Sequence, residues 1–121
     1  MEAAGKGHTE VVVELLNAGA SPNVRTGDGT TALREATVNN QEDVVRILLE
    51  HGADVNAKED IFGTTCLMEA ARVGSVPIVK LLLQHGADVN AMEDTGFTAL
   101  TEASLRGHLT VVNLLKQYGA W

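Results

Sequence analysis

The sequence predicts an all-α repeat fold: a solenoid of stacked helix-turn-helix units with polar, protruding turns between them. A Gly-Ala pair recurs at Gly19, Gly52, Gly86 and Gly119, at intervals of 33, 34 and 33 residues, and such regular intervals are the signature of a repeat array. In the inner units, apolar residues recur at helical spacing just before this pair. A helix pair with one apolar face buries it against the next pair, so the units are expected to stack.

Other columns of the repeat keep the same register along the chain. A threonine, a leucine two residues later and an alanine five residues later recur in three of the units. These columns are Thr31, Thr65 and Thr98; Leu33, Leu67 and Leu100; and Ala36, Ala70 and Ala103. We therefore predict one domain over residues 1–121, and its units span residues 1–25 (partial), 26–59, 60–92 and 93–121.

Each unit is expected to contain two helices. The first spans residues 31–39 in the second unit and 65–73 in the third. It ends at Asn40, Gly74 or Gly107, because glycine, followed by asparagine, best tolerates the left-handed conformation that closes a helix. The second helix carries the apolar stripe, which covers residues 44–49 and 78–83.

Composition and charge exclude several classes of partner. The formal net charge is -7 and the chain has only four aromatic residues, so it lacks the cationic and stacking groups that bind nucleic acid. The amino terminus lacks the apolar core of a signal peptide, and no apolar run is long enough to span a membrane. Cys66 is the single cysteine and cannot form an intramolecular disulfide. We therefore expect a cytoplasmic protein, with the nucleus as the alternative.

The motifs of the units match a known pattern. The matching segments are Thr65 to Ala71 (Thr-Cys-Leu-Met-Glu-Ala-Ala), Gly86 to Ala91 (Gly-Ala-Asp-Val-Asn-Ala), and Gly107-His108 followed by Val111-Val112 and Leu114-Leu115. Over essentially all 121 residues the chain resembles the ankyrin repeat family. The family's usual proline is replaced by Ala32, Cys66 and Ala99, and its usual histidine by Arg34, Met68 and Thr101. The resemblance implies a curved solenoid in which short β-hairpin fingers join the helix pairs. It also implies that the solenoid binds protein partners through these fingers and the first helices, without catalysis.

A carboxylate precedes the alanine column in every unit. The column consists of Glu2, Glu35, Glu69 and Glu102, on the face that lines the concave groove in ankyrin arrays. Stacked helices lie about 8 to 10 Å apart, so these side chains would form an acidic ladder that binds Lys or Arg of a partner. Alternatively, Lys6, Arg72 and Arg106 pair with Glu2, Glu69 and Glu102 and the column is a solvated helix surface.

The turns between units supply a second candidate. The turn after Gly52 is one residue longer than the turn after Gly86 and is expected to bulge near residues 58–59. Bulky apolar residues in these turns either anchor a partner or pack against the neighbouring finger. The predicted partner-binding residues are Ile61, Phe62, Asp94, Thr95 and Phe97 on the fingers, and Glu35, Glu69, Arg72, Glu102 and Leu105 on the inner helices.

We expect no metal, cofactor or catalytic group. His51 and His85 are equivalent positions about 10 Å apart and cannot share a zinc ion whose ligands sit roughly 2 Å away. His8 and His108 are expected to support the turns between helices. Cys66 occupies a turn position that is expected to be buried, and nucleophile, base and orienting group do not occur at plausible spacing.

Two asparagines occupy equivalent positions in the fingers, Asn56 and Asn90. Similar sequences on animal ankyrin arrays are substrates of a 2-oxoglutarate-dependent asparaginyl hydroxylase, so the resemblance makes both residues candidates for modification. The alternative is that their side chains hydrogen-bond nearby finger backbone.

The expected function is a protein-binding scaffold that is a monomer, with no enzymatic activity and a partner that carries a basic segment. Two alternatives stay open: a structural segment of a larger protein, and end-to-end self-association. Met1 aligns with Met68, so the first unit lacks its finger, and both a complete array and an excerpt of a longer chain are compatible with this. Charged Glu14 and Lys116 replace apolar residues of the inner units and favour ends that face water.

Overall fold

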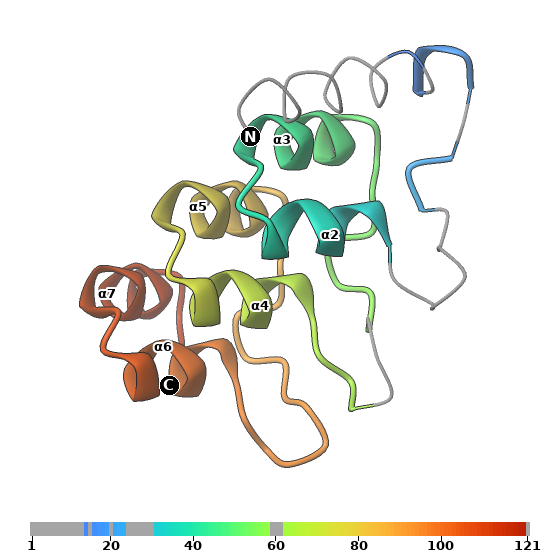
Figure 1. Ribbon diagram of the computed structural model, residues 1–121. Helices are drawn as coiled ribbons and strands as arrows, with labels where there is room; N and C mark the ends of the chain where they lie inside the picture. The colour runs from blue at the N-terminus through green and yellow to red at the C-terminus, as the bar shows by residue number, and fades with distance from the viewer. Residues whose placement is uncertain (1–13, 15, 20, 24–30, 59–61, 121) are drawn as a thin grey trace.

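The computed structural model describes residues 14, 16–19, 21–23, 31–58 and 62–120. Within these residues the chain forms three helix pairs that stack like steps (Figure 1). Helices α2, α4 and α6 form one layer and α3, α5 and α7 the other, and the connections between pairs project on one side. The pairs are α2 (Ala32–Val38) with α3 (Glu42–Glu50), α4 (Cys66–Val73) with α5 (Val76–Gln84), and α6 (Ala99–Arg106) with α7 (Leu109–Gln117). The predicted all-α solenoid is confirmed.

The threonine column starts the helices of the first layer. Thr31 Oγ1 accepts a hydrogen bond from the backbone N–H of Arg34 at 3.2 Å, and Thr65 and Thr98 make the same bond at 3.4 and 3.2 Å. Each bond satisfies one of the backbone donors that a helix leaves unpaired at its start. The threonine is thus the cap, and the helix itself begins one residue later than predicted.

Helices α4 and α6 end where the sequence predicts, whereas α2 ends at Val38, one residue earlier than predicted. Gly74 and Gly107 cap α4 and α6 with φ of 84° and 75°, in the left-handed region. At the corresponding position after α2, Asn40 has φ of 57°. Asparagine is the residue after glycine that best accepts this conformation, so the same turn forms with a different side chain.

The core lies between the two layers and between successive pairs. Leu33, Leu67, Leu82 and Leu115 are fully buried, and small alanines of α4 and α6 let the first-layer helices approach closely. Cys66 is a buried free thiol, as expected. The core is therefore continuous from α2 to α7, as a stacked repeat requires.

The fingers are joined to one another by backbone and side-chain hydrogen bonds. The tip between α5 and α6 is a hairpin turn in which the N–H of Glu93 donates to the carbonyl of Phe97 at 2.9 Å. Its Asp94 N–H donates to the carbonyl of Phe62 in the preceding finger at 2.8 Å. The predicted bulge near residues 58–59 lies partly outside the described residues, as do residues 1–13 with Glu2, Lys6 and His8.

The finger asparagines bind backbone of the next unit. Asn56 donates through Nδ2 to the carbonyl of Gly86 at 3.1 Å and accepts from the N–H of Asp88 through Oδ1 at 2.7 Å. Asn90 donates to the carbonyl of Gly119 at 3.3 Å. The expectation that these side chains hydrogen-bond to backbone is confirmed, with the difference that the backbone belongs to the following unit.

The open side of the last pair is more polar than the equivalent sides of the inner pairs. Exposed Ser104 and Lys116 stand where α4 and α5 have the buried residues Ala71 and Leu83. Glu14, at the other end, is also exposed. No helix among the described residues combines the length and the apolar character that crossing a membrane requires.

Candidate protein-binding surface

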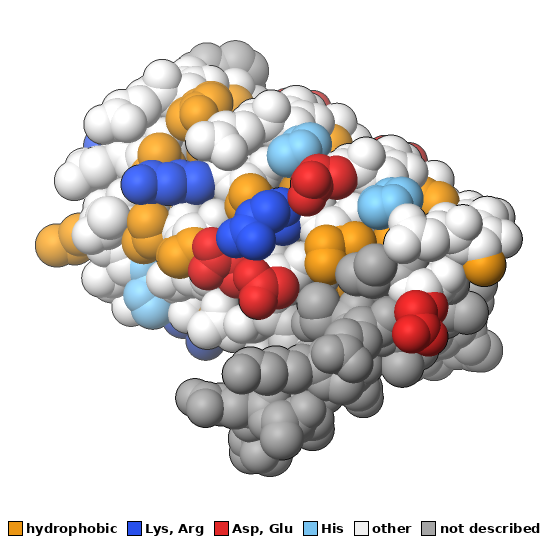
Figure 2. All heavy atoms as spheres, turned by 90° about the horizontal axis from the view of Figure 1, so that it is seen from above, with side chains coloured by type: hydrophobic (Ala, Val, Ile, Leu, Met, Phe, Trp, Pro, Cys, Tyr) orange, Lys and Arg blue, Asp and Glu red, His pale blue; other side chains and the backbone are white. Residues whose placement is uncertain are grey.

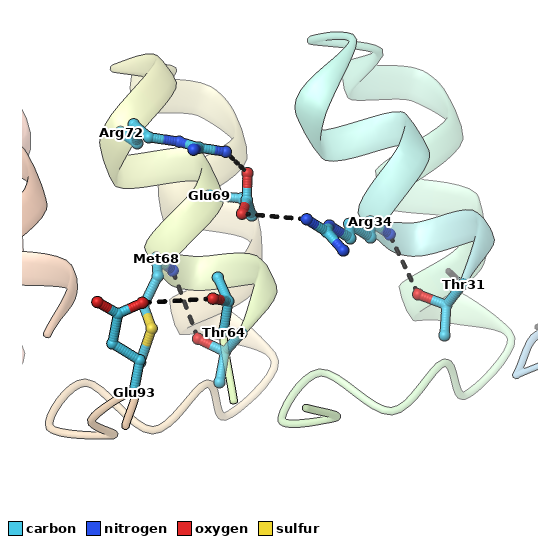
Figure 3. A network of polar contacts seen from close by, with 8 residues as sticks. Thr31, Arg34, Thr64, Met68, Glu69, Arg72 and Glu93 are labelled. Carbon is cyan, nitrogen blue, oxygen red and sulfur yellow. Dashed lines mark hydrogen bonds and ion pairs between the residues drawn. The ribbon is translucent and has the colours of Figure 1, made fainter. Parts of the chain in front are cut away.

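We define the inner face as helices α2, α4 and α6 together with the finger residues 62–64 and 92–97. Its central feature is Glu69, whose side chain is only 3% exposed and lies between two arginines (Figure 3). One carboxylate oxygen contacts Arg72 of the same helix, and the other lies 3.6 Å from Nη2 of Arg34 on α2. The network therefore ties two successive units together.

The burial of Glu69 differs from the expected row of solvated carboxylates. A buried carboxylate is tolerated when it is paired and hydrogen-bonded, and two guanidinium groups meet that need. The pairing with Arg72 follows from spacing along one helix, as expected. Arg34 was missed, because its contact joins residues 35 positions apart. The sequence indicates this contact only through the alignment of the units. In that alignment, Arg34 immediately precedes Glu35, which is the carboxylate of the unit before Glu69.

The other two described carboxylates of the column have different surroundings. Glu35 is exposed, and Glu102 is partly buried. Neither forms an ion pair with another described residue, so Arg106 does not pair with Glu102 as its spacing allowed. The column therefore consists of three unequal sites, and its role in binding a partner stays a prediction.

A hollow of about 270 Å³ lies on the inner face, between the first-layer helices and the fingers. We call it the inner hollow. It is lined by Arg34, Phe62, Thr64, Met68, Glu69, Arg72, Glu93 and Glu102. It thus brings together four of the predicted binding residues: Phe62, Glu69, Arg72 and Glu102. Thr64, Met68 and Glu93 join them from positions that sequence reasoning did not select.

The finger residues predicted to bind a partner are accessible where they are described. Phe62 is 55% exposed and Phe97 36%, and Asp94 and Thr95 are exposed at the tip of the hairpin turn. Met92, which is more exposed than either phenylalanine, was missed because methionine in a polar turn carries no clear signal. Ile61 lies outside the described residues. Leu105, on α6, is 66% exposed.

The outer face, formed by α3, α5 and α7, has a different character. Figure 2 shows this face with acidic, basic and histidine side chains interspersed. On α3, Arg46 pairs with both Glu42 and Asp43 at 3.2 Å, so one positive charge offsets part of the negative charge at the start of this helix. Such exposed pairs contribute little to stability.

The described histidines bind backbone. Nδ1 of His51 and of His85 lies 2.9 Å from a carbonyl oxygen one turn earlier in the same helix. His108 reaches the preceding unit, where its Nε2–H donates to the carbonyl of Arg72 at 3.1 Å. His108 thus supports the turn between helices, as expected. Within the described ranges, no three His, Cys, Asp or Glu side chains are arranged to hold a metal ion.

Comparison with known proteins agrees with this architecture. The family model described as "Ankyrin repeats (3 copies)" matches residues 1–59 and 56–120, and the chain belongs to the ankyrin repeat family. Members of this family mediate protein–protein interaction and are typically scaffolds rather than enzymes.

Its relatives are similar over about half of the chain. An ankyrin repeat-containing protein of Schizosaccharomyces pombe is 37% identical over 57 residues, which are 47% of this chain and 28% of the relative. A putative ankyrin repeat-containing protein of Treponema pallidum is 46% identical over 54 residues, 45% of this chain and 18% of the relative. The mitochondrial disaggregase of Bos taurus is 43% identical over 60 residues, half of this chain and 9% of the relative. The chain therefore matches a minor part of each relative's length.

Proposed function

We propose that this chain is a scaffold that binds a protein partner through its inner face and performs no chemistry itself. The observation that carries the proposal is the inner hollow, which has the exposed ring of Phe62 at its edge and carboxylates in its wall. Aromatic side chains beside a hollow are typical anchors of protein interfaces. The proposed contact residues remain those predicted from the sequence, and the proposed location is the cytoplasm or the nucleus.

The charge of the inner face favours a basic partner segment. Glu35, Asp94 and Glu102 carry no ion pair to another described residue, whereas the acidic groups at the start of α3 are paired. Uncompensated carboxylates raise the association rate of a positively charged partner and orient it on the surface. The net charge of -7 acts in the same direction at longer range.

A peptide library tests the proposed surface. Binders would be selected from displayed random peptides, and their contact residues would be mapped by amide chemical shifts. We expect the largest shifts in α2, α4, α6 and the fingers. Binders whose shifts lie on α3, α5 and α7 would contradict the proposal.

Charge variants sharpen this test. Glu35→Lys with Glu102→Lys should weaken binding of the selected peptides at least about tenfold, because it removes the two uncompensated helix carboxylates. The matched control is Glu42→Lys with Glu50→Lys on α3, which changes the net charge equally on the outer face. Glu69 is left unchanged, since a lysine there would be buried between two arginines.

The similar segments make up less than a third of each relative described above, which favours a second candidate function: the chain is a structural segment of a larger protein.

We further propose that the chain by itself is a monomer, because end-to-end stacking would bury Ser104 and Lys116 at the open side of α6 and α7. Sedimentation over a range of concentrations tests this. A dimer would restore self-association as the better interpretation.

A further inference from the structure

The contact between α2 and α4 contains an arginine that the contact between α4 and α6 lacks. Arg34 follows its cap threonine by three residues and reaches Glu69, which follows the next cap threonine by four. The residues at the same two positions one unit further along are Met68 and Glu102. The second contact therefore repeats the carboxylate of the first and replaces its cation with an uncharged side chain.

Within the described part of the chain, Glu102 consequently lacks the paired cation that Glu69 has. It is partly buried, lines the inner hollow and pairs with no other described residue. Arg72 lines the same hollow, but its guanidinium is held by Glu69. A partly desolvated carboxylate gains more from a cation than a fully solvated one, because the local dielectric constant is lower.

The other walls of the hollow suit a planar cation. Glu93 adds a second carboxylate, which accepts hydrogen bonds from the hydroxyls of Thr64 at 3.4 Å and Thr95 at 2.6 Å. Phe62 presents a partly exposed ring, and guanidinium groups stack on aromatic faces. The volume of about 270 Å³ exceeds that of several water molecules, so a side chain can enter.

The side chains that line the hollow carry one more negative than positive charge. Its lining contains two arginines and three glutamates, and both arginines contact the same buried carboxylate. Neither of the remaining two carboxylates, of Glu93 and Glu102, forms an ion pair with another described residue. One additional positive charge would bring the site to neutrality.

We propose that the inner hollow binds an arginine side chain of the protein partner. Glu102 accepts hydrogen bonds from its guanidinium in the way that Glu69 pairs with Arg34, and the ring of Phe62 covers its plane. Arginine is favoured over lysine because the fork of N–H donors reaches two carboxylates at once. The inference rests on the proposed function, since it names the partner side chain that the inner face receives.

A small probe separates this inference from the proposed function. Nα-acetyl-arginine methylamide would be titrated into the protein while amide chemical shifts are recorded. The matched control is the citrulline analogue, which has nearly the same shape without the charge. We expect saturable shifts around Glu102 and Phe62 with arginine only. Equal shifts with both compounds, or none with either, would overturn the inference.

Three variants locate the binding. Glu102→Gln should weaken arginine binding about tenfold, as expected for the loss of one charge-assisted contact, while Glu50→Gln on the outer helix α3 should leave it unchanged. Met68→Arg should abolish arginine binding, because the new guanidinium group would pair with Glu102 within the protein itself. Equal effects of the two glutamine variants, or undiminished binding to a folded Met68→Arg protein, would overturn the site. If selected peptides still map to the inner face in those cases, the proposed function stands and only the arginine site fails.

Discussion

At Gly74, the cost of a left-handed backbone and the cost of a steric clash can be measured separately. It caps α4 with φ of 84°, and a Cβ atom built on it would lie 2.7 Å from ring atoms of His108 in the next unit. Gly107 caps α6 with φ of 75°, and a Cβ atom there would meet nothing within 4 Å. The two glycines share a backbone conformation, but only Gly74 has another side chain in the space that a Cβ atom would occupy.

We expect Gly74→Ala to destabilise the protein more than Gly107→Ala. The left-handed conformation costs an alanine about 1–2 kcal/mol at either site. At Gly74 the new methyl group also displaces the His108 ring, which breaks its 3.1 Å hydrogen bond to the carbonyl of Arg72 and adds about 1 kcal/mol. The expected losses in the free energy of unfolding are therefore about 2–3 kcal/mol and about 1–2 kcal/mol.

Urea unfolding followed by circular dichroism measures both losses. A double-mutant cycle with His108→Ala isolates the steric part, because removing the ring should reduce the cost of Gly74→Ala to that of Gly107→Ala. The reasoning is refuted if Gly74→Ala costs the same with and without the ring. It is also refuted if the two alanine variants are equally stable in the otherwise unchanged protein.

Three other predictions concern buried or bridging side chains. Glu69→Ala should lower the unfolding free energy by about 3 kcal/mol, because it leaves two arginines without their anion, whereas Glu35→Ala should change it by less than about 0.5 kcal/mol; equal losses in urea would contradict this. Asn56→Ala removes two hydrogen bonds between units and should cost about 1–2 kcal/mol, seen as a lower thermal midpoint. An unchanged midpoint would show that these bonds contribute nothing. The thiol of Cys66 should resist a thiol reagent in buffer and react in urea, and rapid reaction of the native protein would disprove its burial.

Modification of the finger asparagines stays a prediction. The side chain of Asn56 makes hydrogen bonds through both its oxygen and its nitrogen to the next unit. An enzyme acting on this residue would therefore have to separate the two fingers first. The unit boundaries at residues 25, 59 and 92 also stay predictions, although each helix pair lies within one predicted unit.

The sequence by itself determined the helices, their caps and their order. Thr31, Thr65 and Thr98 start helices and Gly74 and Gly107 end them through bonds and dihedral angles that involve only neighbouring residues. Such local effects act wherever the residue type occurs. Because the cap residues recur at a regular interval, each helix boundary can be predicted from several units at once. Stacking then follows because each pair has an apolar face to bury.

Only the tertiary structure decided what each member of the carboxylate column does. Glu35, Glu69 and Glu102 hold the same position in successive units, yet one is exposed, one is buried between two arginines and one is partly buried and pairs with no other described residue. The difference comes from the preceding unit, which supplies Arg34 to Glu69 and Met68 to Glu102. Electrostatic surroundings depend on neighbours in space, and these belong to other units of the chain.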